Sequence, residues 1–324
     1  MAEGAAPRPV ELRPPDIGRW RDGGGTGVPW VHHFDSGRPG ARVMVQALTH
    51  GNELCGALAL DWLLALGARP QAGTLTLAFA NVEAFHRFDP ADPDASRCVD
   101  EDLNRVWADE VLDGPRDSLE LRRARALRPF VDAAEQLLDI HSMGEPCAPL
   151  MVCGRSDKNA RYAMALGVPE VLLIDTGHPA GLRMVERGGF GDEASPRHAL
   201  LIECGQHWER AAEDVAIDTL VRFLAHTGVM DRAWALKYER LQRPTAQRLV
   251  RVTEAVVARS AGFRFLVPVV GLSVVAEAGT PIAQDGDQVW TAPYDNTVLV
   301  MPGLAHCRPG NTMVRLGRLE SLQA

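Results

Sequence analysis

The sequence predicts an α/β fold in which a mostly parallel or mixed sheet lies between helices, followed by a smaller β-rich domain. Short apolar runs typical of buried strands alternate with helix-length segments through the first two thirds of the chain. This alternation is typical of a sheet covered by helices on both faces. From about Met230 the helical segments give way to short β-type runs broken by Gly, Pro, Asp and Asn. A length of 324 residues is enough for about two domains.

The expected elements follow one another in strand and helix order. Strands are expected at 42–48, 74–80, 136–140, 149–153, 171–175 and 198–203. Helices are expected at 53–66, 118–134, 159–166 and 209–224, with Gly167 and Gly228 as helix ends. Later β-type runs lie at 263–270, 273–276, 288–291 and 297–300. We therefore predict one domain over residues 1–230 and a β-rich domain over residues 231–324.

Charge and hydropathy exclude several classes of partner. The net charge of −8 argues against nucleic acid, because phosphate binding requires a concentrated basic surface. The most apolar segment, 57–66, contains Asp61 and is far shorter than the roughly 20 residues of a membrane span. The first residues show no signal-peptide pattern, and the six cysteines form no C-x-x-C pair, so we expect a cytoplasmic protein with free thiols. The sequence leaves open whether the chain forms a homo-oligomer.

Two histidines and a glutamate follow predicted strands. His50 and Glu53 stand in ALTHGNELCG, after the first clear strand, and His141 stands in LLDIHSM, after another. Ligands of open α/β sheets bind beyond the carboxyl ends of the strands. Two imidazoles and a carboxylate are the ligands of a hydrolytic zinc site, so we expect one Zn²⁺ per chain. The alternative is that both histidines are ordinary loop or core residues, since the H-x-x-E spacing alone is a weak signal.

Two further groups of polar residues are candidates for binding and catalysis. Arg105 ends the string RCVDEDLNR, which begins at Arg97, and its planar guanidinium suits a substrate carboxylate. The alternative for this string is a solvated charged turn. Glu203 directly follows four apolar residues, so burial should raise its pKa unless a cation compensates. It is either a general base and acid or a carboxylate buried beside an arginine.

Together these strings resemble the succinylglutamate desuccinylase and aspartoacylase family, a branch of the zinc carboxypeptidase-like hydrolases. The resemblance covers about residues 42–208, with THGNE at His50 and Glu53, DIHS at His141, and DLNR ending at Arg105. It implies that these histidines and Glu53 hold zinc. The family's remaining roles are carried over as follows: polarisation of the scissile carbonyl by Arg97, substrate anchoring by Asn104 and Arg105, and proton transfer by Glu203. Tyr294 corresponds to an active-site tyrosine of some members, and the alternative is a loop tyrosine packed against the β-rich domain.

The resemblance implies hydrolysis of the amide bond of a small-molecule N-acyl amino acid or a close analogue. It leaves the partner of the substrate's α-carboxylate unassigned. One alternative is a zinc carboxypeptidase that acts on a peptide, because that broader group shares the metal pattern. Another is a non-catalytic metal-binding module. The presence of Glu203 and Arg105 argues against such a module, because metal binding requires neither residue.

Overall fold

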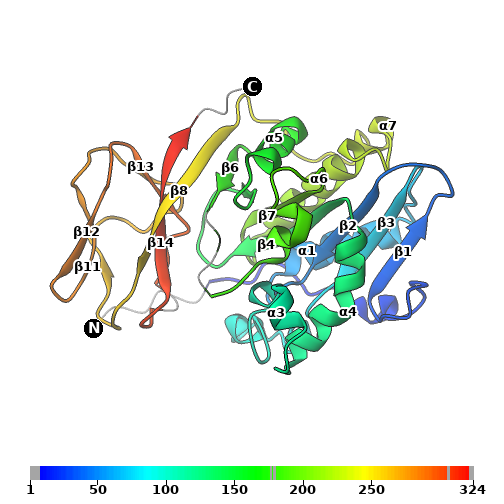
Figure 1. Cartoon of the computed structure of the whole chain (residues 1–324), viewed down its shortest axis with the longest axis horizontal. Coiled ribbons are helices and arrows are strands. Elements are labelled where there is room, and N and C mark those ends of the chain that lie inside the picture. Colours follow the sequence, from blue (N-terminus) through cyan, green and yellow to red (C-terminus); the bar gives the residue numbers. More distant parts are fainter. Residues whose placement is uncertain (1–7, 176, 178–179, 305–306, 321–324) are drawn as a thin grey trace.

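An eleven-stranded sheet forms the centre of the computed structural model, which describes residues 8–175, 177, 180–304 and 307–320 (Figure 1). A second sheet of three strands lies beside it. The strands are β1 (Val31–Asp35), β2 (Arg42–Ala47), β3 (Thr74–Phe79), β4 (Gln136–Met143), β5 (Leu150–Val152), β6 (Val171–Ile174), β7 (His198–Gln206), β8 (Arg248–Val257), β9 (Arg264–Phe265), β10 (Val274–Val275), β11 (Pro281–Asp285), β12 (Gln288–Thr291), β13 (Thr297–Val300) and β14 (Thr312–Glu320). The α-helices are α1 (Leu54–Ala65), α2 (Val82–Phe85), α3 (Asp109–Leu112), α4 (Leu119–Ala133), α5 (Asp157–Leu166), α6 (Arg210–His226) and α7 (Arg232–Ala235).

The large sheet is mixed. Its strand order is β1-β3-β2-β4-β7-β5-β6-β8-β14-β13-β10, and the small sheet has the order β12-β11-β9. The central strands β3, β2, β4 and β7 are parallel, whereas β5 joins β7 in the antiparallel sense. The predicted fold class, a mixed sheet with flanking helices and a smaller β-rich part, is confirmed.

Helices cover both faces of the sheet and bury a separate core on each (Figure 1). The α1 core joins α1, α5 and α6 to one face, and it includes Leu60, Ile140 and Leu220. The α4 core joins α4 and several short helices to the other face, and it includes Leu127 and Met143. Because successive strand residues point to opposite faces, Asp139, His141 and Met143 of β4 share the face of the α4 core.

Two strands extend further than the sequence analysis predicted. β4 continues to Met143 and β7 to Gln206, so His141 and Glu203 lie within strands. The predictions that His141 follows a strand and that Glu203 sits at the end of one were therefore wrong. Polar residues can occupy these positions, although they share the face of the α4 core, because they have polar and charged neighbours: Asp139 and Glu53 for His141, and His141 and Arg97 for Glu203.

The C-terminal strands extend the large sheet. β8 pairs in parallel with β6, and β14 and β13 follow it in the same sheet. The α4 core also crosses this junction, since Val250 and Val300 belong to it together with Val171. Of the run expected at 263–270, only Arg264–Phe265 forms a strand. The domain boundary at 230/231 stays a prediction.

None of the helices in the described part of the chain combines the length and apolar character that a membrane crossing requires.

Candidate functional site

A tight turn between β2 and α1 positions His50 and Glu53. Leu48 opens the turn with a positive φ of 60°. Gly51 packs so closely that a Cβ atom would lie 2.4 Å from the backbone carbon of Ala84, and this contact excludes any larger residue. The sequence analysis expected unusual dihedral angles at Gly51, but close packing requires the glycine and Leu48 carries the positive φ. Glu53 precedes α1, and its side chain is buried.

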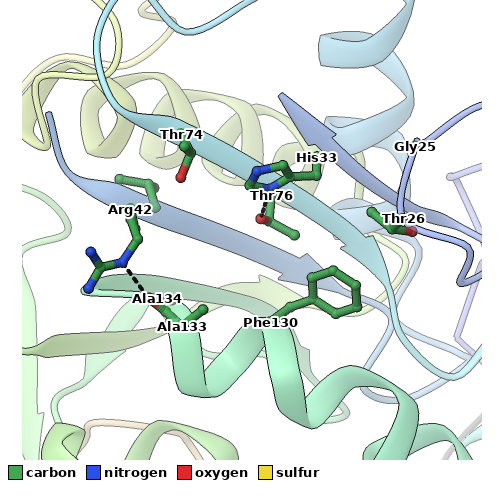
Figure 2. Close-up of a pocket in the computed structure, with 10 residues that line it drawn as sticks. Gly25, Thr26, His33, Arg42, Thr74, Thr76, Phe130, Ala133 and Ala134 are labelled. Atoms are coloured by element: carbon green, nitrogen blue, oxygen red, sulfur yellow. Dashed lines mark hydrogen bonds between the residues drawn. The ribbon is translucent and has the colours of Figure 1, made fainter. Parts of the chain in front are cut away.

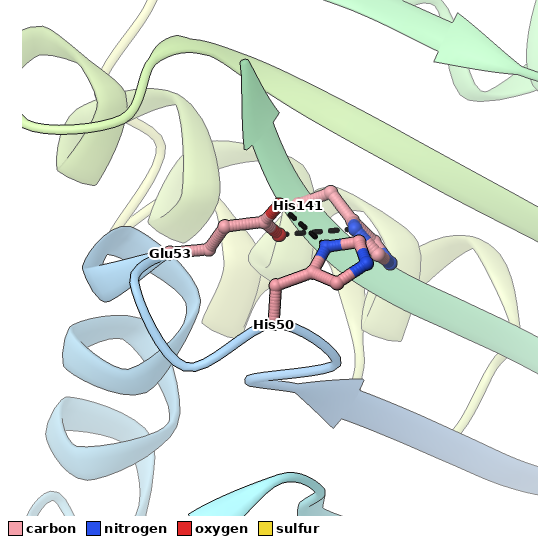
Figure 3. A group of neighbouring side chains, drawn as sticks. All are labelled: His50, Glu53 and His141. Carbon is pink, nitrogen blue, oxygen red and sulfur yellow. Dashed lines mark hydrogen bonds and ion pairs between the residues drawn. The ribbon is translucent and has the colours of Figure 1, made fainter. Parts of the chain in front are cut away.

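The structure brings His50, Glu53 and His141 together (Figure 3). One potential ligand atom from each lies within 4.8 Å of the other two. Nδ1 of His50 is 2.7 Å from Oε1 of Glu53, and Nδ1 of His141 is 3.0 Å from Oε2 of Glu53. All three side chains are buried. This group could hold a metal ion, as its residue types predicted.

Two aspartates that the sequence analysis did not single out as partners contact the far nitrogens of the histidines. Asp139 accepts a hydrogen bond from Nε2 of His141 at 2.7 Å, and Asp102 lies 3.0 Å from Nε2 of His50. Metal-bound histidines usually have such a partner, which fixes the ring and leaves the other nitrogen free for the metal. The D-x-H spacing on a strand could have identified Asp139, because residues two apart share a face.

The charges around the three side chains fit a bound cation. Burial disfavours a charged His141, but Asp139 and Glu53 outweigh it and hold the pKa of His141 well above its usual value. Burial likewise opposes ionisation of Glu53, yet His50 and His141 keep the pKa of its carboxyl well below the usual range. With Nε2 of each ring facing an aspartate, Nδ1 of each ring faces Glu53 and is the nitrogen that a metal ion would bind in place of a proton. A cation would satisfy all three acceptors, and zinc prefers this donor set.

Arg97 and Asp102 lie beside this group on the segment between α2 and α3. Nη2 of Arg97 is 3.1 Å from Oδ2 of Asp102 and 2.9 Å from Nε2 of His50. Because a guanidinium only donates hydrogen bonds, Arg97 donates to the Asp102 carboxylate, whereas Nε2 of His50 donates to Asp102 in one tautomer and accepts from Arg97 in the other. Burial opposes the charge of Asp102, but His50 and Arg97 together hold its pKa far below the usual range.

Glu120, from the first turn of α4, holds this loop in place. Its buried carboxylate accepts hydrogen bonds from the backbone N–H groups of Val99, Asp100 and Glu101 at 2.6 to 3.3 Å. It also accepts one from the amide of Asn81 at 3.0 Å. Nothing in the local sequence indicates this role, since the partners come from two distant segments. The contact fixes the loop on which Arg97 and Asp102 stand.

Asn104 and Arg105 lie in a short 3-10 helix, Leu103–Arg105, that Asp102 caps. Oδ1 of Asn104 accepts a hydrogen bond from the backbone N–H of Met184 at 3.2 Å, so this buried side chain orders the neighbouring segment. Arg105 is 3.8 Å from Asp102, which is its one carboxylate partner among the described residues. Burial, together with nearby arginines, lowers the pKa of Arg105 to about 10, so it remains a cation at neutral pH.

Glu203 projects from β7 on the same face as His141, its register partner on β4. Its Oε2 atom is buried and has no hydrogen-bond partner within the described residues. Burial raises the pKa of Glu203 to about 8, because the nearby cations His141 and Arg97 do not outweigh burial and the charge of Glu53. The sequence analysis expected this shift unless a cation compensated. A carboxyl group with this pKa can both accept and donate a proton near neutral pH.

The side chain of Tyr294 contacts residues of the C-terminal strands β8 and β14. Its hydroxyl is 2.8 Å from Oγ1 of Thr253, and the guanidinium of Arg318 lies 4.3 Å from the centre of its ring. Among the interactions within the described ranges, none joins Tyr294 to His50, Glu53 or His141. Its role in substrate binding stays a prediction.

A pocket elsewhere in the molecule contains none of the predicted site residues (Figure 2). It has a volume of about 250 Å³ and lies near the amino ends of β2 and β3, where Arg42 and Thr74 line it. His33 and Thr76 are joined there by a hydrogen bond of 2.9 Å, and Phe130 of α4 lines another side. Because His50 follows the carboxyl end of β2, this pocket lies at the opposite end of that strand.

Comparisons with known proteins identify a family for this chain. Residues 39–225, more than half of the chain, match the profile of the succinylglutamate desuccinylase/aspartoacylase catalytic domain. A comparison with curated proteins returned no match.

Several solved structures share the fold. A succinylglutamate desuccinylase from Vibrio parahaemolyticus is 18% identical with a TM-score of 0.61, and the match covers 90% of this chain and 86% of that one. A succinylglutamate desuccinylase/aspartoacylase from Rhodobacter sphaeroides is 18% identical with a TM-score of 0.63, over 88% and 87% of the chains. A product-bound ectoine utilization protein from Ruegeria pomeroyi is 16% identical with a TM-score of 0.62, over 89% and 88%. With its matched catalytic domain and this shared fold, the chain belongs to the succinylglutamate desuccinylase/aspartoacylase family of deacylase hydrolases.

Proposed function

We propose that this protein is a zinc-dependent deacylase that hydrolyses the amide bond of an N-acyl amino acid or a close analogue. The observation that carries the proposal is the position of Glu203. An unpartnered, partly buried carboxyl with a pKa of about 8 lies beside the His50, Glu53 and His141 group. Metal binding alone would not require such a residue, whereas hydrolysis requires a group that moves protons. The cytoplasmic location expected from the sequence remains part of this proposal.

His50, Glu53 and His141 would hold the zinc ion, with Asp102 and Asp139 orienting the two imidazoles. When bound, zinc supplies Lewis acidity, which polarises an acyl oxygen and lowers the pKa of a neighbouring water molecule. Glu203 removes a proton from the attacking water and then delivers a proton to the leaving amine.

The arginines and Asn104 position the substrate. The guanidinium of Arg97 donates hydrogen bonds to the oxygen that becomes negative as the acyl carbon turns tetrahedral. Arg105, whose nearest carboxylate is 3.8 Å away, binds a substrate carboxylate, and Asn104 holds the adjacent chain in register.

A screen of acyl groups and amines tests this proposal. The purified protein, stripped of metal and reloaded with zinc, is assayed on acetyl, succinyl and longer acyl derivatives of acidic, basic and apolar amino acids. A set of peptides with free carboxyl termini tests the carboxypeptidase alternative in parallel. The proposal expects hydrolysis of N-acyl amino acids that chelation abolishes and zinc restores. Hydrolysis of peptides alone, or of no compound at all, would refute it.

A further inference from the structure

Arg315 lies on β14, on the face of the sheet that carries the candidate site. Its neighbours Val314 and Leu316 pack with Val256 in a third apolar core, formed by the C-terminal strands, so the side chain of Arg315 points to the opposite face. Its register partner Val300 belongs to the α4 core, on the face shared by His141 and Glu203. The C-terminal strands therefore direct one cation toward the face that carries the site.

No side chain within the described ranges pairs with Arg315. Two other arginines in this part of the fold are matched by carboxylates: buried Arg183 with Asp175 and Glu186, and partly buried Arg251 with Asp157 and Glu320. Arg315 is itself partly buried, but it has neither an ion pair nor a side-chain hydrogen bond to any described residue. Since a buried charge is costly unless it is paired, a guanidinium held in this way is suited to an external anion.

Two residues of the candidate site, Glu203 and Arg105, lie within electrostatic range of Arg315. Asp175, Arg183 and Glu186 lie within that range too. Burial lowers the pKa of Arg315, and Arg183 adds to this effect, while Asp175 opposes it. Asp175 cannot serve as a free partner, because it already binds Arg183 with both oxygens. Arg105 and Arg315 are thus two cations, from distant parts of the chain, that lie within electrostatic range of each other, and Arg315 is also within range of Glu203.

We propose that Arg315 is a specificity-determining residue that binds a second carboxylate of the substrate, while Arg105 binds the first. The inference rests on the proposed deacylase function and adds to it that the preferred N-acyl amino acid carries two carboxylates. The second carboxylate can lie on the acyl group or on the amino-acid side chain. Both sources present the planar group that a guanidinium binds through two parallel hydrogen bonds.

Paired substrates test the proposal and distinguish the two sources. N-acetylglutamate is compared with N-acetylglutamine, and N-succinylalanine with N-butyrylalanine, so that each pair differs mainly in one charge. For Arg315→Gln we expect kcat/KM to fall by roughly 10- to 100-fold on the acidic member of at least one pair, mainly through KM. On the neutral members, kcat/KM should change by less than about twofold by the same reasoning. Equal losses on both members of each pair, or no loss on any, would overturn the proposal.

Control variants separate recognition from folding. Arg264→Gln removes an exposed guanidinium of the small sheet and should leave all four rates unchanged. Arg315→Gln removes no internal partner, so its Tm should not fall below that of the wild type. Arg315→Lys keeps the charge without the planar fork and should restore part of the lost rate on acidic substrates. If Arg315→Gln is unstable, Arg315→Lys alone tests the proposal. A fall in kcat/KM on the acidic substrates only supports it, and an equal fall on acidic and neutral substrates contradicts it.

Binding to a Glu203→Gln protein supplies a readout that does not depend on turnover. Calorimetry on this background, with and without Arg315→Gln, should show at least tenfold weaker binding of the acidic compounds only. If the wild type hydrolyses neither these four compounds nor any N-acyl amino acid of the wider screen but this selective binding persists, the deacylase function fails and the role of Arg315 stands. If hydrolysis occurs and binding shows no dependence on Arg315, the role of Arg315 is wrong and the deacylase function stands.

Discussion

Three carboxyl groups of the site differ in charge because their surroundings differ. All three experience burial, which favours the neutral form, but Asp102 and Glu53 lie against histidines and arginines that hold their pKa values well below the usual range. Oε2 of Glu203 has no histidine, arginine or other hydrogen-bond partner among the described residues, and burial raises the pKa of this carboxyl to about 8. Opposed shifts of this kind separate groups that bind cations from groups that exchange protons. We therefore assign proton transfer to Glu203.

The raised pKa of Glu203 predicts a pH-dependent stability in the metal-free protein. In the unfolded chain this carboxyl has an ordinary pKa near 4.5, and in the folded protein the pKa is about 8. The folded state therefore binds the proton more tightly, and the associated stability is complete below 4.5 and lost as the pH rises through 8. Glu203→Gln should remove this pH dependence. The free energy of unfolding of the variant, measured in urea, should therefore rise relative to that of the wild type between pH 5 and about 8. A constant difference across that range would contradict the assigned pKa.

Arg105→Lys tests whether this side chain binds a carboxylate through its planar fork. Lysine keeps the charge but cannot form two parallel hydrogen bonds, so kcat/KM should fall roughly tenfold or more on the best substrate. Zinc content should stay at the wild-type value, because Arg105 contacts none of the three metal-binding side chains. Arg161→Lys, at an exposed arginine paired with Glu193, is the matched control. Wild-type kinetics in Arg105→Lys would make Arg105 a structural residue.

At the scale of elements, the loop from Arg97 to Arg105 depends on the first turn of α4. Replacing Glu120 with Ala would leave three backbone N–H groups and the amide of Asn81 without their acceptor. We expect a loss of roughly 3 kcal/mol in the free energy of unfolding, as for other hydrogen-bonded charges, together with a lower kcat/KM. Glu110→Ala, at an exposed position of α3, should change neither quantity. Denaturant unfolding measures the loss, and equal stability of the two variants would show that Glu120 does not order the loop.

The sequence predicted the elements whose apolar pattern is strong and local. It located β2, α1, β3, α4 and α6 within a few residues, because each buries a continuous apolar run or stripe. It did not identify β8 or β14, in which charged residues alternate with apolar ones. Arg251 of β8 lies in a strand because Glu320 of β14 and Asp157 of α5 pair with it. Such partners are distant in sequence, so local patterns cannot reveal them.

The same limit applies to the candidate site. The motifs around His50 and His141 identified the three side chains that the structure brings together. The sequence analysis did not pair Asp102 with His50, because 52 positions separate them and only the folded loop joins them. Asp139 was overlooked for a different reason. The strand that contains Asp139 was expected to end before His141. The alternation of side chains that places Asp139 and His141 on one face of β4 was therefore not considered.

At the scale of the whole molecule, the C-terminal strands are joined to the large sheet by backbone hydrogen bonds and by the α4 core. A chain truncated after Thr245 would lose β8 and expose the edge of β6 together with Val171 and Leu173. Lost pairing and exposed apolar surface should prevent cooperative folding. Urea unfolding followed by near-ultraviolet circular dichroism would show this as a missing or broadened transition. A sharp transition would instead support an independent domain over residues 1–230.

The most direct test of the deacylase mechanism measures zinc content and turnover together in Glu203→Gln. The substitution preserves the size of the side chain and removes its base, while the three metal-binding side chains remain intact. We predict one zinc per chain and a near-normal Tm, as in the wild type, with kcat on the best N-acyl amino acid reduced roughly a thousandfold. Loss of zinc along with activity would make Glu203 a ligand or a structural support. Full activity with normal zinc content would show that another group transfers the proton, and it would contradict the mechanism.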